Sequence, residues 1–345
     1  MPRRAKAPAL LFWRLLRWAA IGLIWLIVLG LIGWAGCALY IDLPPAWQIP
    51  LTILYALLIA GILVFGRTRF RRLSFCLLAF VAVLAWWLSL SPTDDRPWQP
   101  DVDRTAWADI DGDRVTIHNL RNFDYRTETD FTPRWEVRQY DLSQIKAVDI
   151  FLTYWGSPWI AHPILSFQFG DKDHVAFSIE TRKIIGDSYS TLRGFFRQYN
   201  LIYIVADERD VIRLRTNYRA GEEVYLYRTT ATPDAARAVF LDYLRSLNAL
   251  HAHPQFYNAL TSNCTTDIRI HTKALPESAP PWDWRLLLNG KSDEYAYQHG
   301  RLAGNLPFDE LKRQAHINDA AREAGQSPDY STLIRRDRAG FSIAN

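Results

Sequence analysis

Cysteine is scarce in this sequence. The 345 residues include only 3 Cys and 1 Met. Cys37 and Cys76 lie in long apolar runs, which leaves Cys264 as the single cysteine of the rest of the chain. One cysteine cannot form a disulfide within a domain, so a disulfide-based scaffold is excluded. A lone thiol is either buried and inert or kept for its chemistry.

An excess of positive charge is also missing from most of the chain. Residues 1–92 hold 9 Lys and Arg against 1 acidic residue, which leaves 31 against 35 for the remainder. The larger part is therefore mildly acidic, and its electrostatics give no reason to expect a nucleic-acid partner. The sequence shows no internal repeat, heptad run or low-complexity segment.

Long apolar runs are abundant in the first 92 residues. Three of them, at about 19–41, 46–66 and 73–92, carry no charged residue. Each is close to the ~20 residues that a transmembrane helix needs. Basic side chains precede the first run and fill the loop between the second and third, whereas the first loop carries only Asp42. Since Lys and Arg in short loops stay in the cytoplasm, we expect a cytoplasmic N-terminus and an exported domain after about residue 93.

We expect three parts: a membrane domain at 1–92, a linker rich in Pro and Asp at 93–110, and a folded domain at 111–345. Alternating side chains predict strands at 115–120, 201–206 and 223–228, and a weaker one at 211–215. Helices are expected to begin at Thr232 and near Asn263. Because strands and helices do not alternate regularly, the pattern favours an α+β domain with an antiparallel sheet.

The clearest predicted element is a hairpin at residues 159–180 with a GDKD turn. Odd positions such as Phe167 and Phe177 are apolar, and even positions include His162, His174 and Glu180. Successive side chains of a strand point to opposite faces, so the even positions share the polar face.

Cys264 is the candidate nucleophile. It follows Thr261, Ser262 and Asn263, which are residue types that cap helix N-termini. The amides at the start of a helix would favour the reactive thiolate and stabilise an oxyanion during acyl transfer. The alternative is a buried structural cysteine.

A thiol nucleophile needs a histidine that takes its proton and later protonates the leaving group. His162 is the candidate, because it projects from the polar face of its strand. Glu180 is expected on the same face, directly opposite His162 or one diagonal away, where it would orient the imidazole. His174 is the alternative third residue. An ion pair with Arg182 or Arg134 is the alternative role for Glu180.

Three segments, HPILSFQF, SIETR and FYNALTSNCTT, resemble the Lnb-type periplasmic domain, named after a bacterial lipoprotein N-acyltransferase. The resemblance extends from about Asp111 to Phe341 and includes RNFDYR and DERDVIRLR. The domain is also similar to circularly permuted papain-like (NlpC/P60) thiol enzymes, in which a strand-borne His precedes an Asn-Cys pair. Carried over by position, the resemblance makes Cys264 the nucleophile and His162 its base.

The resemblance implies a papain-like, thiol-dependent acyl-transfer enzyme, anchored in the bacterial inner membrane with its domain in the periplasm. We expect membrane lipid or lipoprotein as substrate and a thioester on Cys264 as intermediate. A cysteine peptidase or amidase acting on cell-wall peptide uses the same residues and is one alternative. A non-catalytic, membrane-anchored binding module is another. The leading helices differ from the membrane arrangement of the acyltransferase that names the domain, which leaves the substrate open.

Zinc binding is the competing site chemistry, with His251, His253, Cys264 and His271 as ligands. Their spacing matches no standard zinc pattern, so we expect neither a metal nor another cofactor. The aromatic stretch 281–288 (PWDWRLLL) either packs in the core or enters the membrane surface.

Overall fold

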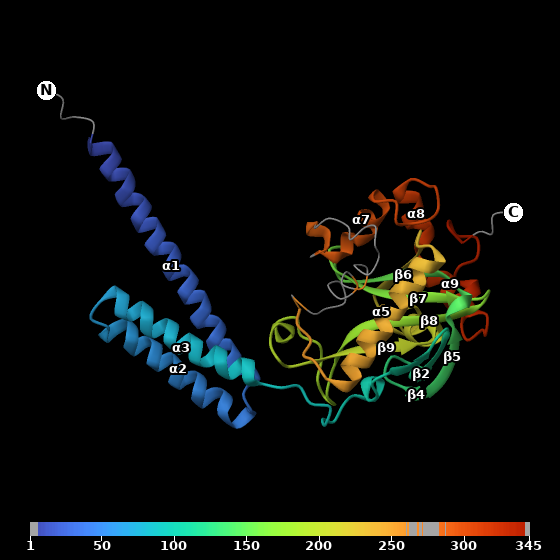
Figure 1. The fold of residues 1–345 in the computed structure, drawn as a ribbon, viewed down its shortest axis with the longest axis horizontal. Coiled ribbons are helices and arrows are strands. Elements are labelled where there is room, and N and C mark those ends of the chain that lie inside the picture. Colours follow the sequence, from blue (N-terminus) through green and yellow to red (C-terminus); the bar gives the residue numbers. More distant parts are fainter. Residues whose placement is uncertain are drawn as a thin grey trace. The chain divides into compact units, whose positions relative to one another are not determined.

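The computed structural model describes residues 6–259, 261, 268, 271, 283–286 and 288–341. The chain forms two compact units. One comprises residues 1–92 with 192–198, and the other comprises 93–191 with 199–345. Figure 1 shows the helices and strands of both units.

The first unit contains three long apolar helices, α1 (Lys6–Asp42), α2 (Pro45–Phe65) and α3 (Arg69–Ser89). Each is long and apolar enough to cross a membrane, which confirms the three predicted apolar helices. Pro45 at the first position of α2 costs no hydrogen bond, because helix-start amides have no partner within the helix. Thr68 caps α3 by accepting a hydrogen bond from the Arg71 amide.

Residues 192–198 belong to this helical unit and contact the ends of its helices. The carboxylate of Asp42 accepts hydrogen bonds from the Arg197 amide (3.1 Å), Gln198 Nε2 (2.7 Å) and Trp87 Nε1 (2.7 Å). The Phe196 ring stacks on Trp34. Asp42, the single acidic residue of the three apolar helices, thus accepts hydrogen bonds from three donors.

The second unit is built on a mixed, mostly antiparallel sheet. Within the described residues, eight strands join in the order β1-β2-β9-β8-β7-β6-β10, with β5 paired to β2 and one parallel contact between β2 and β9. These strands are β1 (Trp107–Asp111), β2 (Arg114–Arg121), β5 (Trp135–Asp141), β6 (Ile145–Trp155), β7 (Ala161–Phe169), β8 (Asp173–Arg182), β9 (Asn200–Ala206) and β10 (Glu222–Arg228). A separate ribbon pairs β3 (Asp124–Tyr125) with β4 (Phe131–Thr132).

The remaining elements are mostly helical. They are η1 (Pro100–Val102), η2 (Leu142–Gln144), α4 (Glu208–Arg213), the π-helical turn η4 (Leu214–Tyr218), α5 (Pro233–Ala252), η5 (Trp284–Leu286), η6 (Asn289–Lys291), α7 (Ser292–Gln298), α8 (Phe308–Ala315), α9 (Asn318–Ala324) and α10 (Tyr330–Leu333). In the first unit, η3 (Arg193–Phe195) forms a single short turn. The strands predicted at 115–120, 201–206 and 223–228 are confirmed as β2, β9 and β10.

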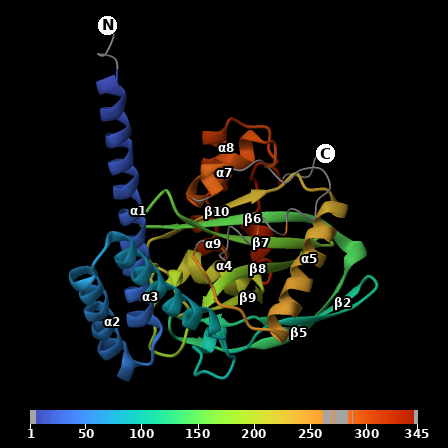
Figure 2. The same cartoon turned by 60° about the vertical axis from the view of Figure 1, so that its left-hand side comes forward.

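The predicted hairpin is confirmed as β7 and β8, and helices cover both of its faces. Odd-position side chains such as Phe167 and Phe177 pack with Phe240 and Tyr243 of α5, which crosses the strands (Figure 2). Thr232 caps α5 as predicted, by accepting from the Ala235 amide. The other face also carries apolar residues, which pack with α4, α9 and α10. The even-position face is therefore buried rather than solvated, and polar groups on it need partners.

The strand predicted at 211–215 is wrong, because these residues form the end of α4 and the start of η4. Asp207 caps α4 by accepting from the Arg209 amide, and Asp210 forms a buried ion pair with Arg121. The alternation of VIRLR suits a strand, but this cap and the buried partner of Asp210 favour the helix.

Residues 93–110, expected as a linker, are packed into the second unit. Trp98 and Val102 are buried. Arg182 donates to Asp94 Oδ1 (2.6 Å) and lies over the Trp98 ring. The Pro and Asp content of this stretch suits a linker, whereas buried side chains such as Trp98 and Val102 fix it to the second unit.

Candidate active site

His162 lies near the start of β7, on the face of the sheet that α4, α9 and α10 cover. In the β6–β7 ladder it is paired with Thr153. Continuing the β7–β8 register two residues beyond the Ile164–Ser178 pair places His162 opposite Glu180. The structure thus brings together the two residues that the hairpin pattern placed on one face.

Ser178 joins His162 to Glu180. Its hydroxyl lies 2.7 Å from His162 Nε2 and donates to Glu180 Oε1, also at 2.7 Å. The direct distance from Nε2 to Oε1 is 3.8 Å, too long for a hydrogen bond. Ser178 was not among the residues predicted from the sequence, although its even position in the hairpin is a signal that could have indicated it.

These contacts set the tautomer of His162. A serine hydroxyl has one proton, and here it goes to the carboxylate of Glu180, which only accepts when it is ionised. The hydroxyl oxygen must then accept from His162, so Nε2 carries the ring proton. Nδ1 is left with a free lone pair, and no described residue hydrogen-bonds it. It is the atom of this group that can accept a proton.

Arg215, at the start of η4, supplies the positive charge of the site. Its guanidinium donates to Glu180 Oε1 and to Glu222 Oε2, both at 3.1 Å. It is only 5% exposed. Arg182 does not pair with Glu180, because it is bonded to Asp94 instead. Arg215 was not predicted, since nothing in the sequence indicated that residues 180 and 215 would meet in three dimensions.

Burial and this charge keep His162 neutral. Desolvation, followed by the nearby Arg215 guanidinium, lowers the pKa of His162 to about 3, and the Glu180 carboxylate opposes the shift. For Glu180, burial would raise the pKa, but the positive charges of Arg215 and Arg121 hold it below its ordinary value. At neutral pH the group is therefore an uncharged imidazole joined through a hydroxyl to a carboxylate.

A second hydroxyl lies beside the imidazole without a partner. Thr153 is fully buried, and its Oγ1 makes no hydrogen bond within the part of the chain that the structure describes. A buried hydroxyl without a partner costs free energy. Because Thr153 pairs with His162 in the β6–β7 ladder, this unpaired hydroxyl belongs to the candidate site.

Asn289 and Gly290 fix the start of β7. The Asn289 side chain accepts from the Ala161 amide (2.9 Å) and donates to the Ala161 carbonyl (2.6 Å). The Gly290 amide donates to the Trp159 carbonyl, and a Cβ on Gly290 would meet the backbone of Pro158 and Trp159. The residue directly before His162 is thus held by side-chain hydrogen bonds.

Of the other predicted residues, those that the structure describes are not joined to this group. Cys264, and the helix expected near Asn263, lie outside the described residues. His174 is paired with Gln168, six residues along β7 from His162, or about 20 Å at the usual rise of a strand. Its Nδ1 donates to the Lys172 carbonyl. His271, one of the four candidate zinc ligands, contacts Asp242 Oδ2 (2.7 Å) and the Tyr203 hydroxyl.

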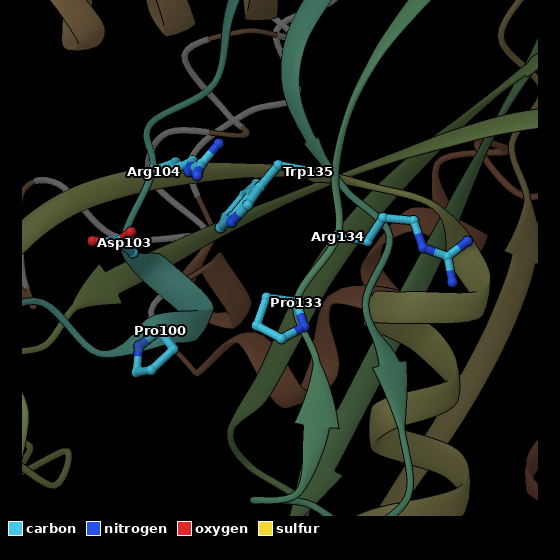
Figure 3. Close-up of a pocket in the computed structure, with 6 residues that line it drawn as sticks. All are labelled: Pro100, Asp103, Arg104, Pro133, Arg134 and Trp135. Carbon is cyan, nitrogen blue, oxygen red and sulfur yellow. The ribbon is translucent and has the colours of Figure 1, made fainter.

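A pocket of about 450 Å³ lies elsewhere in the second unit. Figure 3 shows its lining residues, which are Pro100, Asp103, Arg104, Pro133, Arg134 and Trp135. Arg104 lies over the Trp135 ring, whereas Arg134 points away. This open, arginine-lined hollow contains none of the predicted catalytic residues.

No curated protein and no solved structure matches the sequence significantly. The family model of the Lnb N-terminal periplasmic domain matches residues 131–290. That segment includes His162, Ser178, Glu180 and Arg215, and it also includes Cys264. The resemblance to the Lnb-type periplasmic domain is confirmed over residues 131–290, which match this family model.

Proposed function

We propose that this chain is a cysteine-dependent acyl-transfer enzyme of the bacterial inner membrane, with its domain in the periplasm and lipid or lipoprotein as substrate. The observation that carries the proposal is the hydrogen-bonded chain from His162 through Ser178 to Glu180. It leaves one ring nitrogen of a neutral imidazole free to accept a proton. This is the state that a general base needs.

The membrane location rests on the three apolar helices and on the charges that flank them. Arg3 and Arg4 precede α1, which begins at Lys6, and Arg67 lies between α2 and α3, which begins at Arg69. By the distribution of positive charge, these ends face the cytoplasm, and the chain after α3 is exported. The match to a periplasmic domain family supports the same orientation.

In the proposed reaction, His162 Nδ1 takes the thiol proton of Cys264, and the sulfur attacks the carbonyl carbon of an ester or amide. The bond from that carbon to oxygen or nitrogen then breaks, and the imidazolium gives its proton to the departing group. A second nucleophile passes its proton to His162 and attacks the thioester, which returns the thiolate. An amine acceptor gives acyl transfer, and water gives hydrolysis.

The depressed pKa of His162 is compatible with this role. An imidazole with a pKa of about 3 is a weak base in the resting site, but it is wholly unprotonated at neutral pH. When it takes the proton of Cys264, a thiolate forms beside it, and a nearby negative charge favours the imidazolium. Glu180 favours it further through Ser178. The similarity to circularly permuted papain-like enzymes is part of this proposal.

The test uses the full-length protein in lipid nanodiscs, with Cys37 and Cys76 replaced by Ala so that Cys264 is the single thiol. A thiol-directed acyl probe is added at neutral pH, and the adduct is located by mass spectrometry. We expect an adduct on Cys264 and its loss in a His162→Gln protein. His174→Gln is the matched control, because His174 is also a buried histidine of the hairpin.

Equal labelling of the wild-type and His162→Gln proteins would leave His162 without a role. Absence of any adduct on Cys264 in a folded protein would end the enzymatic proposal. It would then favour a membrane-anchored binding module.

A further inference from the structure

Exposed apolar side chains of the second unit are concentrated in two short segments. We call the aromatic face the group of Trp155, Trp159, Ile160, Trp284 and Leu288, whose side chains are 44%, 47%, 50%, 49% and 41% exposed. Among the described residues of this unit, the other exposed large apolar side chains are scattered along the sequence, at Ile110, Val137, Ile185 and Tyr189. Singly exposed apolar residues are normal, whereas a contiguous group marks an interaction surface.

The two segments lie side by side. The Trp159 and Trp284 rings are 6.4 Å apart between centroids, and the Gly290 amide donates to the Trp159 carbonyl at 3.0 Å. Trp155 ends β6, and its carbonyl accepts from the Ser157 amide in the turn that leads to Trp159. The aromatic face is therefore one surface held by backbone hydrogen bonds.

This surface borders the candidate site. Ile160 is separated from His162 only by Ala161. Trp155 lies two residues beyond Thr153, the partner of His162 in the β6–β7 ladder, so it shares the face of the sheet with the imidazole. A molecule bound at the aromatic face is next to the proposed proton acceptor.

The composition of the face suits a bilayer surface. Tryptophan is enriched at the level of lipid headgroups, where its ring is in an apolar layer and its N–H remains near water. Lys291 Nζ lies 5.6 Å from the centre of the Trp159 ring and forms no ion pair with any carboxylate that the structure describes. The Lys291 ammonium beside the exposed indoles is placed to meet a lipid phosphate.

The covalent tether favours a bilayer over a soluble partner. The last membrane helix ends at Ser89, and Trp98 is already buried in the second unit. The intervening residues span at most about 30 Å when fully extended. The domain therefore remains within reach of lipid at all times, at a high local concentration of membrane surface.

We propose that the aromatic face docks on the phospholipid surface of the membrane, so that acyl chains reach the His162 site directly from the bilayer. The docking stands independently, and the delivery of a substrate rests on the function proposed above. Interfacial binding of this kind buries apolar side chains roughly 5–10 Å into the boundary between headgroups and acyl chains.

The test places one fluorophore at a time in the full-length protein. Cys37, Cys76 and Cys264 are replaced by Ala, and Trp159→Cys or Trp284→Cys is labelled with an environment-sensitive dye. Val137→Cys and Ile110→Cys are the controls, because Val137 and Ile110 are exposed apolar residues outside the aromatic face. Each protein is placed in nanodiscs of ordinary or brominated phosphatidylethanolamine and phosphatidylglycerol.

At the depth expected for an interfacial anchor, brominated lipid should quench the dye at 159 and 284 roughly twofold or more, and leave the dye at 137 and 110 nearly unchanged. Absence of quenching at 159 and 284, or equal quenching at all four positions, would overturn the docking proposal. Because Cys264 is absent from these proteins, the result does not depend on acyl transfer.

Discussion

The Nε2 atom of His162 lies 3.8 Å from Oε1 of Glu180, and the Ser178 hydroxyl joins the two through hydrogen bonds of 2.7 Å each. The arrangement follows from strand geometry, since His162 and Glu180 are opposite each other and Ser178 is two residues from Glu180 on the same face. The hydroxyl fixes the ring orientation and tautomer while the carboxylate remains ionised. The group can therefore be tested one member at a time.

Replacing Ser178 by Ala should slow labelling of Cys264 by about 10- to 100-fold, since hydrogen bonds to charged groups are worth about 1.5–3 kcal/mol. The ring would lose its partner at Nε2 and with it the fixed tautomer. Ser166→Ala is the matched control, because Ser166 is also fully buried in the hairpin and donates to the buried carboxylate of Glu208. Equal slowing by the two substitutions would reduce Ser178 to a structural role.

Arg215→Met and Glu180→Gln should move the pKa of His162 in opposite directions. The Arg215 charge lowers this pKa and the Glu180 charge raises it, so the first substitution raises the value from about 3 and the second lowers it further. The measurement is the rate of His162 carbethoxylation against pH, since only the neutral imidazole reacts. As pH falls, the carbethoxylation rate of the Arg215→Met protein should begin to decrease at a higher pH than the rate of the Glu180→Gln protein. Shifts of the same sign would contradict the assigned charges.

The stability of the second unit should fall in mild acid because of His162. Its pKa is about 3 in the folded protein against an ordinary 6.5, so between these values the unfolded chain binds the additional proton. The free energy of unfolding then decreases as pH falls from about 6.5, by at most ~1.4 kcal/mol per pH unit from this group. His162→Gln should flatten the dependence of Tm on pH, measured by thermal unfolding in nanodiscs. An unchanged dependence of Tm on pH in the His162→Gln protein would contradict this assignment.

Local patterns predicted much of this site. The period of two in the hairpin placed His162 and Glu180 on one face, and Thr232 with Pro233 marked the start of α5. Both signals depend on short-range geometry, which a single sequence contains. The three apolar helices were predictable for the same reason, because their signal is the composition of a continuous segment.

What the sequence could not predict depends on long-range contacts. The even positions of the hairpin include polar side chains, which predicts a solvated face. In the structure, helices cover this face, and ion pairs satisfy its charged groups. Arg335, near the C-terminus, donates to Glu208 Oε1 (2.6 Å) and to Asp149. No local pattern signals that such distant charges meet, nor that Arg215 reaches Glu180. The strand β6 was missed because it is buried along most of its length and lacks clear alternation.

Asn289→Ala should destabilise the start of β7. The substitution removes the acceptor of the buried Ala161 amide and the donor to its carbonyl, and each unpaired buried group costs about 1–3 kcal/mol. We expect a lower Tm together with slower labelling of Cys264, because Ala161 directly precedes His162. Asn318→Ala is the control: the Asn318 side chain makes the same pair of contacts with β10, to the Val224 amide and the Glu222 carbonyl. Asn318→Ala should lower Tm but slow the labelling of Cys264 less than Asn289→Ala does. A larger effect of Asn318→Ala on labelling would argue against a positioning role for Asn289.

Asp42→Ala should release residues 192–198 from the three apolar helices. The carboxylate is the shared acceptor for the Arg197 amide, the Gln198 side chain and the Trp87 indole. The substitution therefore removes three hydrogen bonds at once. A loss of ~1.4 kcal/mol in the closed form raises the open population about tenfold, and proteolysis tracks that population when opening is fast. Limited trypsin digestion in nanodiscs should therefore cut after Arg193 or Arg197 about tenfold faster than in the wild type. Thr68→Ala removes the cap of α3 without touching Asp42, and it should leave these cuts unchanged. Unchanged cleavage in Asp42→Ala would mean that the stacking of Phe196 on Trp34 is sufficient to hold the segment.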